Sequence, residues 1–176
     1  MEKEPLVLTL DIGTQSVRAM IFDATGKPLA EEKANYEPAY FSSEPGYAEQ
    51  DPDYYWMRAI TATQALAKNH RALLKRVGAM SMTCFRDSAV LLDSDKKPLR
   101  PAILWLDQRQ ADLQQSLPLL SQLAFYLVGM SETVKMNRKR TPAIWIQEHE
   151  PEIWRKTTHY MTISTYLTYK LIGSIV

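Results

Sequence analysis

The sequence has 176 residues, of which 45% are hydrophobic and 23% charged, a profile that predicts one globular domain of the α/β or α+β class with a sizeable core. The formal net charge is only +1. This balance excludes a strong bias toward nucleic acid or anionic membrane surfaces and favours a neutral small-molecule partner.

Further classes are excluded by what the sequence lacks. Cys84 is the single cysteine, so no internal disulfide can form, and its apolar setting indicates a small core residue rather than a nucleophile. We expect a cytoplasmic protein, because no N-terminal apolar segment is long enough for a signal peptide or membrane span. The glycine motifs of P-loop and dinucleotide-binding folds do not occur, and the three histidines are too scattered to suggest a Cys/His metal cluster.

The first predicted element is a β-hairpin over Leu6–Asp23, where two apolar, β-rich runs flank a polar turn. Asp11 ends the first strand, and Gly13 permits a positive φ in the turn. The residues that follow, Thr14 to Ser16, offer backbone N–H groups and small or polar side chains. Such a turn can bind phosphate.

The string from Asp11 to Arg18, followed by an apolar strand, resembles the phosphate-binding hairpin of the FGGY carbohydrate kinases, members of the sugar kinase, actin and chaperone ATPase superfamily. The resemblance implies that Asp11 holds magnesium through its water shell and that Arg18 faces the transferred phosphoryl group, which makes both catalytic candidates. It also implies that the phosphates of ATP bind at Gly13, Thr14, Gln15 and Ser16. An ordinary hairpin with a surface Asp and Arg would show the same local pattern.

A turn at Gly26 leads into a third predicted strand over Pro28–Tyr36, which completes an antiparallel meander, and Glu37–Gln50 is expected to be a loop. A helix should begin after Asp51, a good N-cap residue, with Pro52 at its first position. Its spacing predicts a buried stripe of Trp56, Ile60, Thr63, Leu66 or Ala67, and Leu73 or Leu74. A capped helix explains these residues, yet the segment from Pro45 to Pro52 also resembles the one preceding the first long helix in FGGY kinases.

Two apolar runs, Val77–Cys84 and Ser88–Leu92, predict buried strands, with the charged pair Arg86 and Asp87 between them. Charged residues between core strands favour a strand end that faces a cleft, although a solvated loop is the alternative. The pair resembles an Arg-acid dipeptide that hydrogen-bonds polyol hydroxyls in the glycerol kinase branch of the family. Asp87 is shorter than the glutamate of that branch, so the polyol stays open.

Trp105, Asp107 and Arg109 alternate with apolar residues, so an extended segment would place all three on one face. An indole above an Asp/Arg pair suits a sugar, because the ring covers C–H faces while charged groups bind hydroxyls. A helix start with an ordinary ion pair is the alternative. The pattern resembles the FGGY segment whose tryptophan and its neighbours line the substrate cleft, which makes Trp105 and Asp107 substrate-binding candidates alongside Arg86 and Asp87.

The last third of the chain should be mostly helical. The pattern predicts helix over Gln110–Val128 with an interruption at Pro118, and a solvated basic loop over Val134–Arg140. We expect a helix from Thr141 with Trp145 and Ile146 packed, a strand over Tyr160–Ile163 and a helix over Ser164–Gly173.

Together these motifs predict an α/β fold of the RNase H-like (actin-like ATPase) type, a mixed sheet flanked by helices. The expected function is a carbohydrate kinase that transfers the γ-phosphoryl of MgATP to a hydroxyl of a sugar or polyol, with ATP and Mg²⁺ as cofactors and no nucleic-acid or membrane partner. The alternatives are a nucleotide-switched interaction ATPase of the actin or chaperone kind and a non-catalytic binding fragment.

The resemblance also predicts how the chain relates to a longer enzyme. Residues 1–176 are expected to form the N-terminal part of the FGGY N-terminal domain, with the rest of that domain and the C-terminal domain absent. The general base and the adenine pocket are expected beyond Val176, so this chain alone should not turn over ATP. It should be poorly soluble alone or, if soluble, associate through its exposed apolar faces. A homodimer of the full-length enzyme is allowed.

Overall fold

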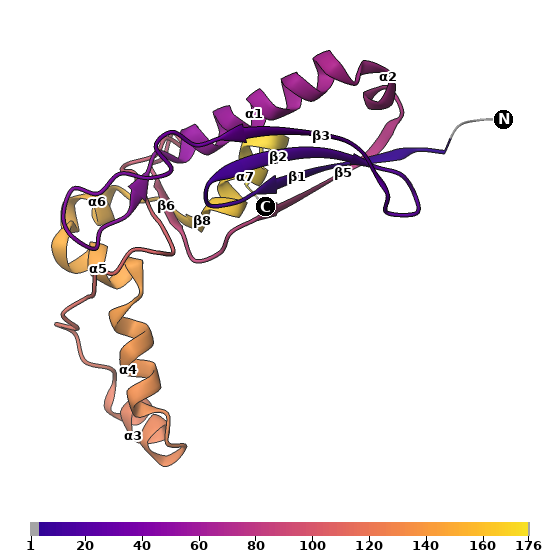
Figure 1. Ribbon diagram of the computed structural model, residues 1–176. Coiled ribbons are helices and arrows are strands. Elements are labelled where there is room, and N and C mark those ends of the chain that lie inside the picture. The colour runs from indigo at the N-terminus through magenta and orange to yellow at the C-terminus, as the bar shows by residue number, and fades with distance from the viewer. Residues whose placement is uncertain (1–3, 176) are drawn as a thin grey trace.

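The computed structural model describes residues 4–175, which form two β-sheets and the helices around them (Figure 1). Across the first sheet the strands are β3 (Pro28–Asn35), β2 (Ser16–Phe22), β1 (Leu6–Ile12) and β5 (Val77–Cys84). Across the second they are β4 (Glu49–Gln50), β7 (Ala102–Ile103), β6 (Ala89–Leu92) and β8 (His159–Thr162). The helices are α1 (Pro52–Asn69), α2 (Arg71–Leu74), α3 (Leu119–Leu127), α4 (Ser131–Lys139), α5 (Pro142–His149), α6 (Pro151–Lys156) and α7 (Ile163–Ile172).

The first sheet is mixed, as the sequence predicts. β2 pairs antiparallel with β1 and β3, which confirms the meander, and β5 pairs parallel with β1. Parallel neighbours need a long crossover connection, and α1 supplies it. The second sheet, whose strands all pair antiparallel, lies beyond the end of the first.

The main core forms where α1 and α7 pack on one face of the first sheet. Alternate residues of β1 and β2, including Leu8, Leu10, Val17 and Ile21, point into this core because side chains alternate along a strand. α1 and α7 are also tied to each other by polar contacts. The Tyr166 hydroxyl donates to the Asp53 carboxylate at 2.7 Å, and Lys170 Nζ lies 2.8 Å from the same carboxylate.

The buried face of α1 differs from the predicted stripe. The residues that face the sheet are Tyr55, Ala59, Ala62 and Leu66, whereas Ile60 is 37% exposed and Trp56 and Thr63 are half-buried. Of the predicted stripe, Leu66 alone is fully buried, and Ala67, Leu73 and Leu74 are partly buried. The small alanines let the helix backbone approach the sheet closely, a role that a search for large apolar side chains does not detect. Two end signals are confirmed: Asp51 caps α1 by accepting from Asp53 N, and Gly173 ends α7 in the left-handed conformation.

The strand β5 is less buried than predicted. Most of its side chains are exposed, because within residues 4–175 it is an edge strand that pairs with β1 alone. β6, by contrast, is buried along its whole length, as expected.

Two predictions in the helical third are wrong. Residues 110–118 are not helical, since Ala111 N donates to Lys139 O and two further amides of the segment bind the Glu148 carboxylate. The expected basic loop is instead the helix α4, whose Glu, Lys, Met and Arg residues are good helix formers. Its side chains are exposed or half-buried, so the expectation of a solvated segment holds for its surface.

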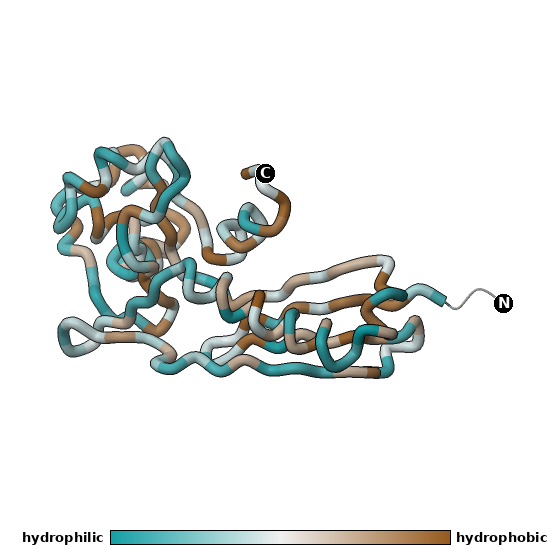
Figure 2. The backbone as a smooth tube through the Cα atoms, turned by 90° about the horizontal axis from the view of Figure 1, so that it is seen from above, coloured by the Kyte–Doolittle hydropathy of each residue, from teal (hydrophilic) through white to brown (hydrophobic). Residues whose placement is uncertain are grey.

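The helical segments α3 to α6 gather at one end of the molecule, opposite the N-terminal end of the first sheet (Figures 1 and 2). In Figure 1, α3 and α4 extend away from both sheets, and α3 carries apolar side chains in contact with solvent, such as Leu119 at 83% exposure. No helix in the described part of the chain combines the length and apolar character needed to cross a membrane.

The position of α1 on the sheet predicts which of its apolar residues carries stability. Leu66→Ala should lower the free energy of unfolding by about 2–5 kcal/mol, because the side chain is fully buried and its loss leaves a cavity. Ile60→Ala, the matched change on the exposed side, should cost about 1 kcal/mol or less. Urea denaturation followed by circular dichroism measures both. A larger loss of unfolding free energy for Ile60→Ala than for Leu66→Ala would instead support the buried stripe predicted from the sequence.

Candidate functional site

The β1–β2 hairpin closes through a tight turn in which Gly13 N donates to Ser16 O at 3.0 Å. The expected reason for glycine is wrong. Gly13 does not adopt a positive φ; the glycines that do are Gly26, Gly46, Gly129 and Gly173. Instead, a Cβ at Gly13 would lie 3.3 Å from Ser16 O, so the close approach of the two backbones favours glycine.

The tip of this turn has free backbone donors. Thr14 and Gln15 are exposed, and within residues 4–175 their amides donate no hydrogen bond, while the Gln15 carbonyl accepts from Tyr36 N at 2.9 Å. Free amides beside one another attract anions. The turn can therefore receive an anionic group from solvent.

Asp11 and Arg18 face each other across β1 and β2. They are register partners, so their Cβ atoms lie on the same face of the sheet, about 4.5–5.5 Å apart. Within the described chain the Asp11 carboxylate has no hydrogen-bond or ion-pair partner. Arg18 makes one long contact, 3.7 Å to Glu31, between side chains that are about half exposed. Both groups are therefore available to a ligand at the end of the hairpin.

Cys84 lies beside this pair, where β5 ends. It packs against the core, and burial is the main cause that raises the pKa of its thiol to about 12, with the Asp11 charge contributing. A thiol with so high a pKa is protonated at neutral pH and a poor nucleophile, in keeping with the core role read from the sequence.

The chain leads directly from this sheet end to the charged pair Arg86 and Asp87. Ile12 pairs with Cys84, and Phe85 N donates to Ile12 O at 3.2 Å, so the parallel pairing of β1 and β5 extends to the start of the connecting loop. Asp87 has φ 60°, a left-handed conformation that Asp tolerates better than most residues. An unusual backbone held at a loop between two strands is typical of a functional position.

A cavity of about 990 Å³ opens beyond this loop, between the second sheet and helices α4 and α5. Three of the predicted substrate residues, Asp87, Trp105 and Asp107, lie on its wall. Arg86 is exposed and does not line the cavity. The structure thus brings together three of the four candidates from two separate segments.

Ser88, which no sequence pattern singled out, holds these segments together. Its side chain is 1% exposed, and its hydroxyl accepts from Trp105 N at 3.0 Å. Trp105 is 54% exposed at the cavity wall, so its indole is accessible to a ligand.

The segment of Trp105, Asp107 and Arg109 is not extended, which is the condition for predicting that the three share one strand face, although all three line the cavity. β7 ends at Ile103, and a turn follows in which Asp107 N donates to Leu104 O at 3.0 Å. The side chains of Asp107 and Arg109 are only 2% and 3% exposed and form an ion pair at 2.7 Å. The alternative of an ordinary ion pair describes their contact, although no helix begins here.

This ion pair belongs to a buried charge cluster that underlies the cavity. Arg109 Nη2 lies 2.7 Å from Glu49 Oε1, and Glu49 also pairs with Arg100, which reaches Glu150. Asp107 Oδ2, the oxygen that pairs with Arg109 Nη2, also accepts from Ala48 N at 2.7 Å. Glu49 lies in the segment from Pro45 to Pro52 that resembles FGGY kinases. The residue spacing of that segment does not predict that Glu49 forms a buried ion pair.

Arg109 is the centre of the charge cluster. Its guanidinium lies over two rings, 3.8 Å from the centroid of Tyr47 and 4.6 Å from that of Trp145. Burial acts to lower the pKa of Arg109, but its bonds to Asp107 and Glu49 outweigh burial and raise it. Arg109 is therefore a permanent charge that positions the wall residue Asp107.

The cavity also contains Asn137 and Arg140, which the sequence placed in a solvated loop. Both are exposed and reach the cavity from the end of α4, whereas Arg138 turns away and donates to Gln115 O. The signal that could have found them is helical spacing, since they are three positions apart and residues so spaced share one side of a helix.

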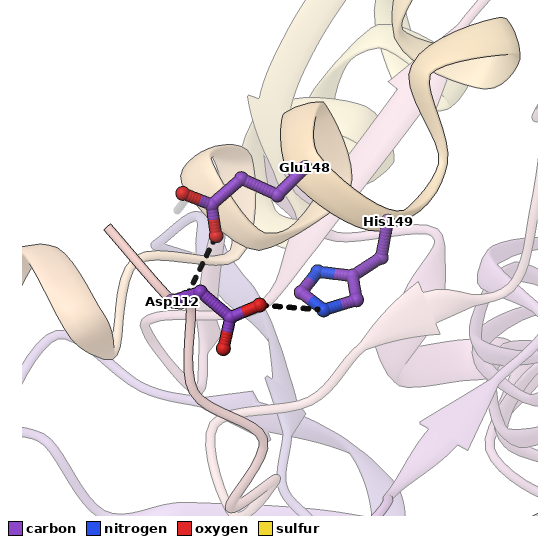
Figure 3. A group of neighbouring side chains, drawn as sticks. All are labelled: Asp112, Glu148 and His149. Carbon is purple, nitrogen blue, oxygen red and sulfur yellow. Dashed lines mark hydrogen bonds and ion pairs between the residues drawn. The ribbon is translucent and has the colours of Figure 1, made fainter. Parts of the chain in front are cut away.

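The residues around Asp11 fit a magnesium ion. Mg²⁺ is commonly bound through one or two carboxylates while keeping several waters, and Asp11 offers a free carboxylate beside the exposed turn. The Asp112, Glu148 and His149 group lies elsewhere, on α5 and the segment before α3 (Figure 3).

Comparison with known proteins finds matches over nearly the whole chain. The model of the FGGY family of carbohydrate kinases, N-terminal domain, matches residues 6–176. A xylulose kinase of Lactococcus lactis is 29% identical over 170 residues, covering 96% of this chain and 33% of the relative. A glycerol kinase of Dechloromonas aromatica is 29% identical over 175 residues, covering 97% of this chain and 34% of the relative. The chain thus spans about a third of the length of these curated relatives.

The fold is shared with solved structures. The xylulose kinase from Rhodospirillum rubrum matches with a TM-score of 0.77 at 24% identity, covering 97% of this chain and 35% of that chain. This likeness confirms the actin-like ATPase type of fold, of which the chain holds a part.

The buried charge cluster predicts a large effect of removing Arg109. Arg109→Met should lower the free energy of unfolding by about 3–5 kcal/mol, because Asp107 and Glu49 lose a buried partner. Arg86→Met, the same change at an exposed arginine, should stay within about 0.5 kcal/mol. Chemical denaturation of both variants measures the difference. Equal stabilities would mean that the charge cluster does not hold this part of the fold.

Proposed function

Because the chain belongs to the FGGY family of carbohydrate kinases, we propose that it contributes the phosphate-binding hairpin and part of the sugar-binding wall of a kinase. The reaction is transfer of the γ-phosphoryl of MgATP to a hydroxyl of a sugar or polyol. One observation supports the proposal most directly. The unpaired Asp11 carboxylate and the free turn amides lie at the end of β1, and the neighbouring strand β5 leads at that same end into the loop that carries Asp87 to the cavity wall.

The hairpin would bind the nucleotide phosphates. The amides of Thr14 and Gln15 are free donors, and Arg18 adds a positive charge on the face that Asp11 occupies. Magnesium, when bound near Asp11, would neutralise charge on the phosphates. Phosphoryl transfer depends mainly on positioning and charge stabilisation, and the turn amides, Arg18 and Asp11 are groups suited to both tasks.

The cavity would bind the acceptor. Asp87 can accept hydrogen bonds from hydroxyls, and Trp105 can cover the C–H face of a sugar ring. Arg86, exposed next to Asp87, would contact a hydroxyl from outside the cavity wall. Asp107 is best described as a wall residue, because Ala48 N and Arg109 already use its oxygens.

The remaining parts of the site would lie outside this chain. The chain spans about a third of its relatives' length, and we place the general base, the adenine pocket and the rest of the N-terminal domain in the other two thirds. An interaction ATPase of the actin or chaperone kind is the second candidate. ATP turnover that depends on a sugar separates the two, because an interaction ATPase has no use for the Asp87 and Trp105 wall.

Asp11→Asn, made in a full-length kinase that contains this chain, should lower kcat by about 10²-fold or more and change the sugar KM little. The reason is that the lost charge acts on magnesium and on the developing phosphoryl charge. Asp95→Asn, at an exposed turn, is the matched control. Steady-state kinetics with saturating ATP give both values, and unchanged turnover in Asp11→Asn would place the magnesium site elsewhere.

Asp87→Asn should reduce kcat/KM for the preferred sugar by roughly 5-fold to 150-fold, corresponding to about 1–3 kcal/mol for an acceptor pairing lost at a hydroxyl. Asparagine tolerates the left-handed backbone of Asp87, so the change tests charge rather than fold. Trp105→Ala should raise the sugar KM, whereas Tyr126→Ala, an exposed aromatic on α3, should not. Normal kinetics in both wall variants would exclude this cavity as the sugar site.

A further inference from the structure

A second group of ligand-type side chains lies apart from the kinase site, between the segment before α3 and the end of α5. Asp112, Glu148 and His149 each offer one ligand atom, and these atoms lie within 4.8 Å of one another (Figure 3). His149 Nε2 is 3.4 Å from Asp112 Oδ2. The kinase reaction gives these residues no role.

The imidazole of His149 is held in a defined orientation from outside the group. Its ring stacks on Trp145, with centroids 4.8 Å apart and planes at 6°. Nδ1 lies 3.1 Å from the Trp145 carbonyl oxygen, and since a carbonyl only accepts, Nδ1 carries the proton. In the neutral ring Nε2 therefore presents a lone pair to Asp112, the arrangement common in metal-binding histidines, whose other nitrogen donates to a carbonyl or carboxylate.

Glu148 is also positioned before any ligand arrives. Its two oxygens accept from Asp112 N at 2.7 Å and from Gln114 N at 2.8 Å. A carboxylate offers about four lone-pair positions, so acceptor capacity remains on both oxygens. Among residues 4–175, neither Asp112 nor Glu148 pairs with a lysine or arginine.

Three acceptor groups thus lie together, with no side-chain donor among them when the imidazole is neutral. We propose that Asp112, Glu148 and His149 bind one divalent transition-metal ion of the Zn²⁺ type. Imidazole nitrogen and carboxylate oxygen are both ligand types of Zn²⁺, and water can complete the coordination. Ligand atoms around a tetrahedral zinc are about 3.4 Å apart, the spacing that Nε2 and Asp112 Oδ2 already have.

The ion would fasten the non-helical segment at Asp112 to α5, next to the cavity that Trp145 lines. The role of the site is therefore structural: it holds one wall of the cavity in place and takes no part in phosphoryl transfer. Mg²⁺, which prefers oxygen ligands and keeps its waters, is a poor occupant.

The test is a Co²⁺ titration of the whole untagged chain, followed by its visible absorption, with Zn²⁺ as the competitor. We expect one Co²⁺ per chain, displaced by Zn²⁺, and a higher thermal midpoint with Zn²⁺ than with a chelator. Asp112→Asn and His149→Phe should weaken binding by at least about tenfold. Phenylalanine keeps the stacking on Trp145, and Glu152→Gln, an exposed acid on α6, should bind like the unchanged chain.

Nitrogen NMR of His149 gives a readout that does not depend on stability. Added Zn²⁺ should shift Nε2 and leave Nδ1 protonated. The proposal is overturned if no metal binds at 1 mM (roughly the weakest affinity of interest), or if both site variants bind like the unchanged chain. It is also overturned if Nε2 stays protonated against Asp112 with Zn²⁺ present, because the group is then an ion pair only.

Discussion

The buried guanidinium of Arg109 is the interaction on which the cavity end of the molecule depends. It joins Glu49 of β4 to Asp107 of the turn after β7, and it lies over the rings of Tyr47 and Trp145. Charges taken out of water are costly unless each is paired and hydrogen-bonded. That cost fixes the geometry, because any arrangement that separates the partners leaves a buried charge uncompensated.

The parallel pairing of β1 and β5 has a comparable effect at the other end of the site. It places the end of β5 beside Asp11, so that Asp87 is only the third residue after the strand. The turn and the cavity wall that we propose for phosphate and hydroxyl binding are thereby held by one backbone ladder. The two halves of the proposed site share a rigid support, which transfer between two bound substrates requires.

The segment before α3 shows how partners from distant parts of the chain replace the hydrogen bonds of a helix. Its amides would be satisfied in a helix, yet here they bind the Lys139 carbonyl and the Glu148 carboxylate. Backbone N–H groups need hydrogen-bond acceptors, and in this segment acceptors distant in the sequence take the place of the carbonyls of a helix. The result places Ala111 in the second core beside Trp145 and Ile146.

The sequence by itself determined the local features: the hairpin, the Asp51 cap, the helix start at Pro142, the glycine that ends α7, and the FGGY family through its ordered motifs. Each depends on contacts between near neighbours or on recognisable strings. The tertiary structure alone decided that Ala59 and Ala62 face the sheet, that Arg109 pairs with Glu49, and that Ser88 holds Trp105. Those contacts join residues far apart in the chain, and local periodicity carries no information about which distant partner satisfies a buried polar group.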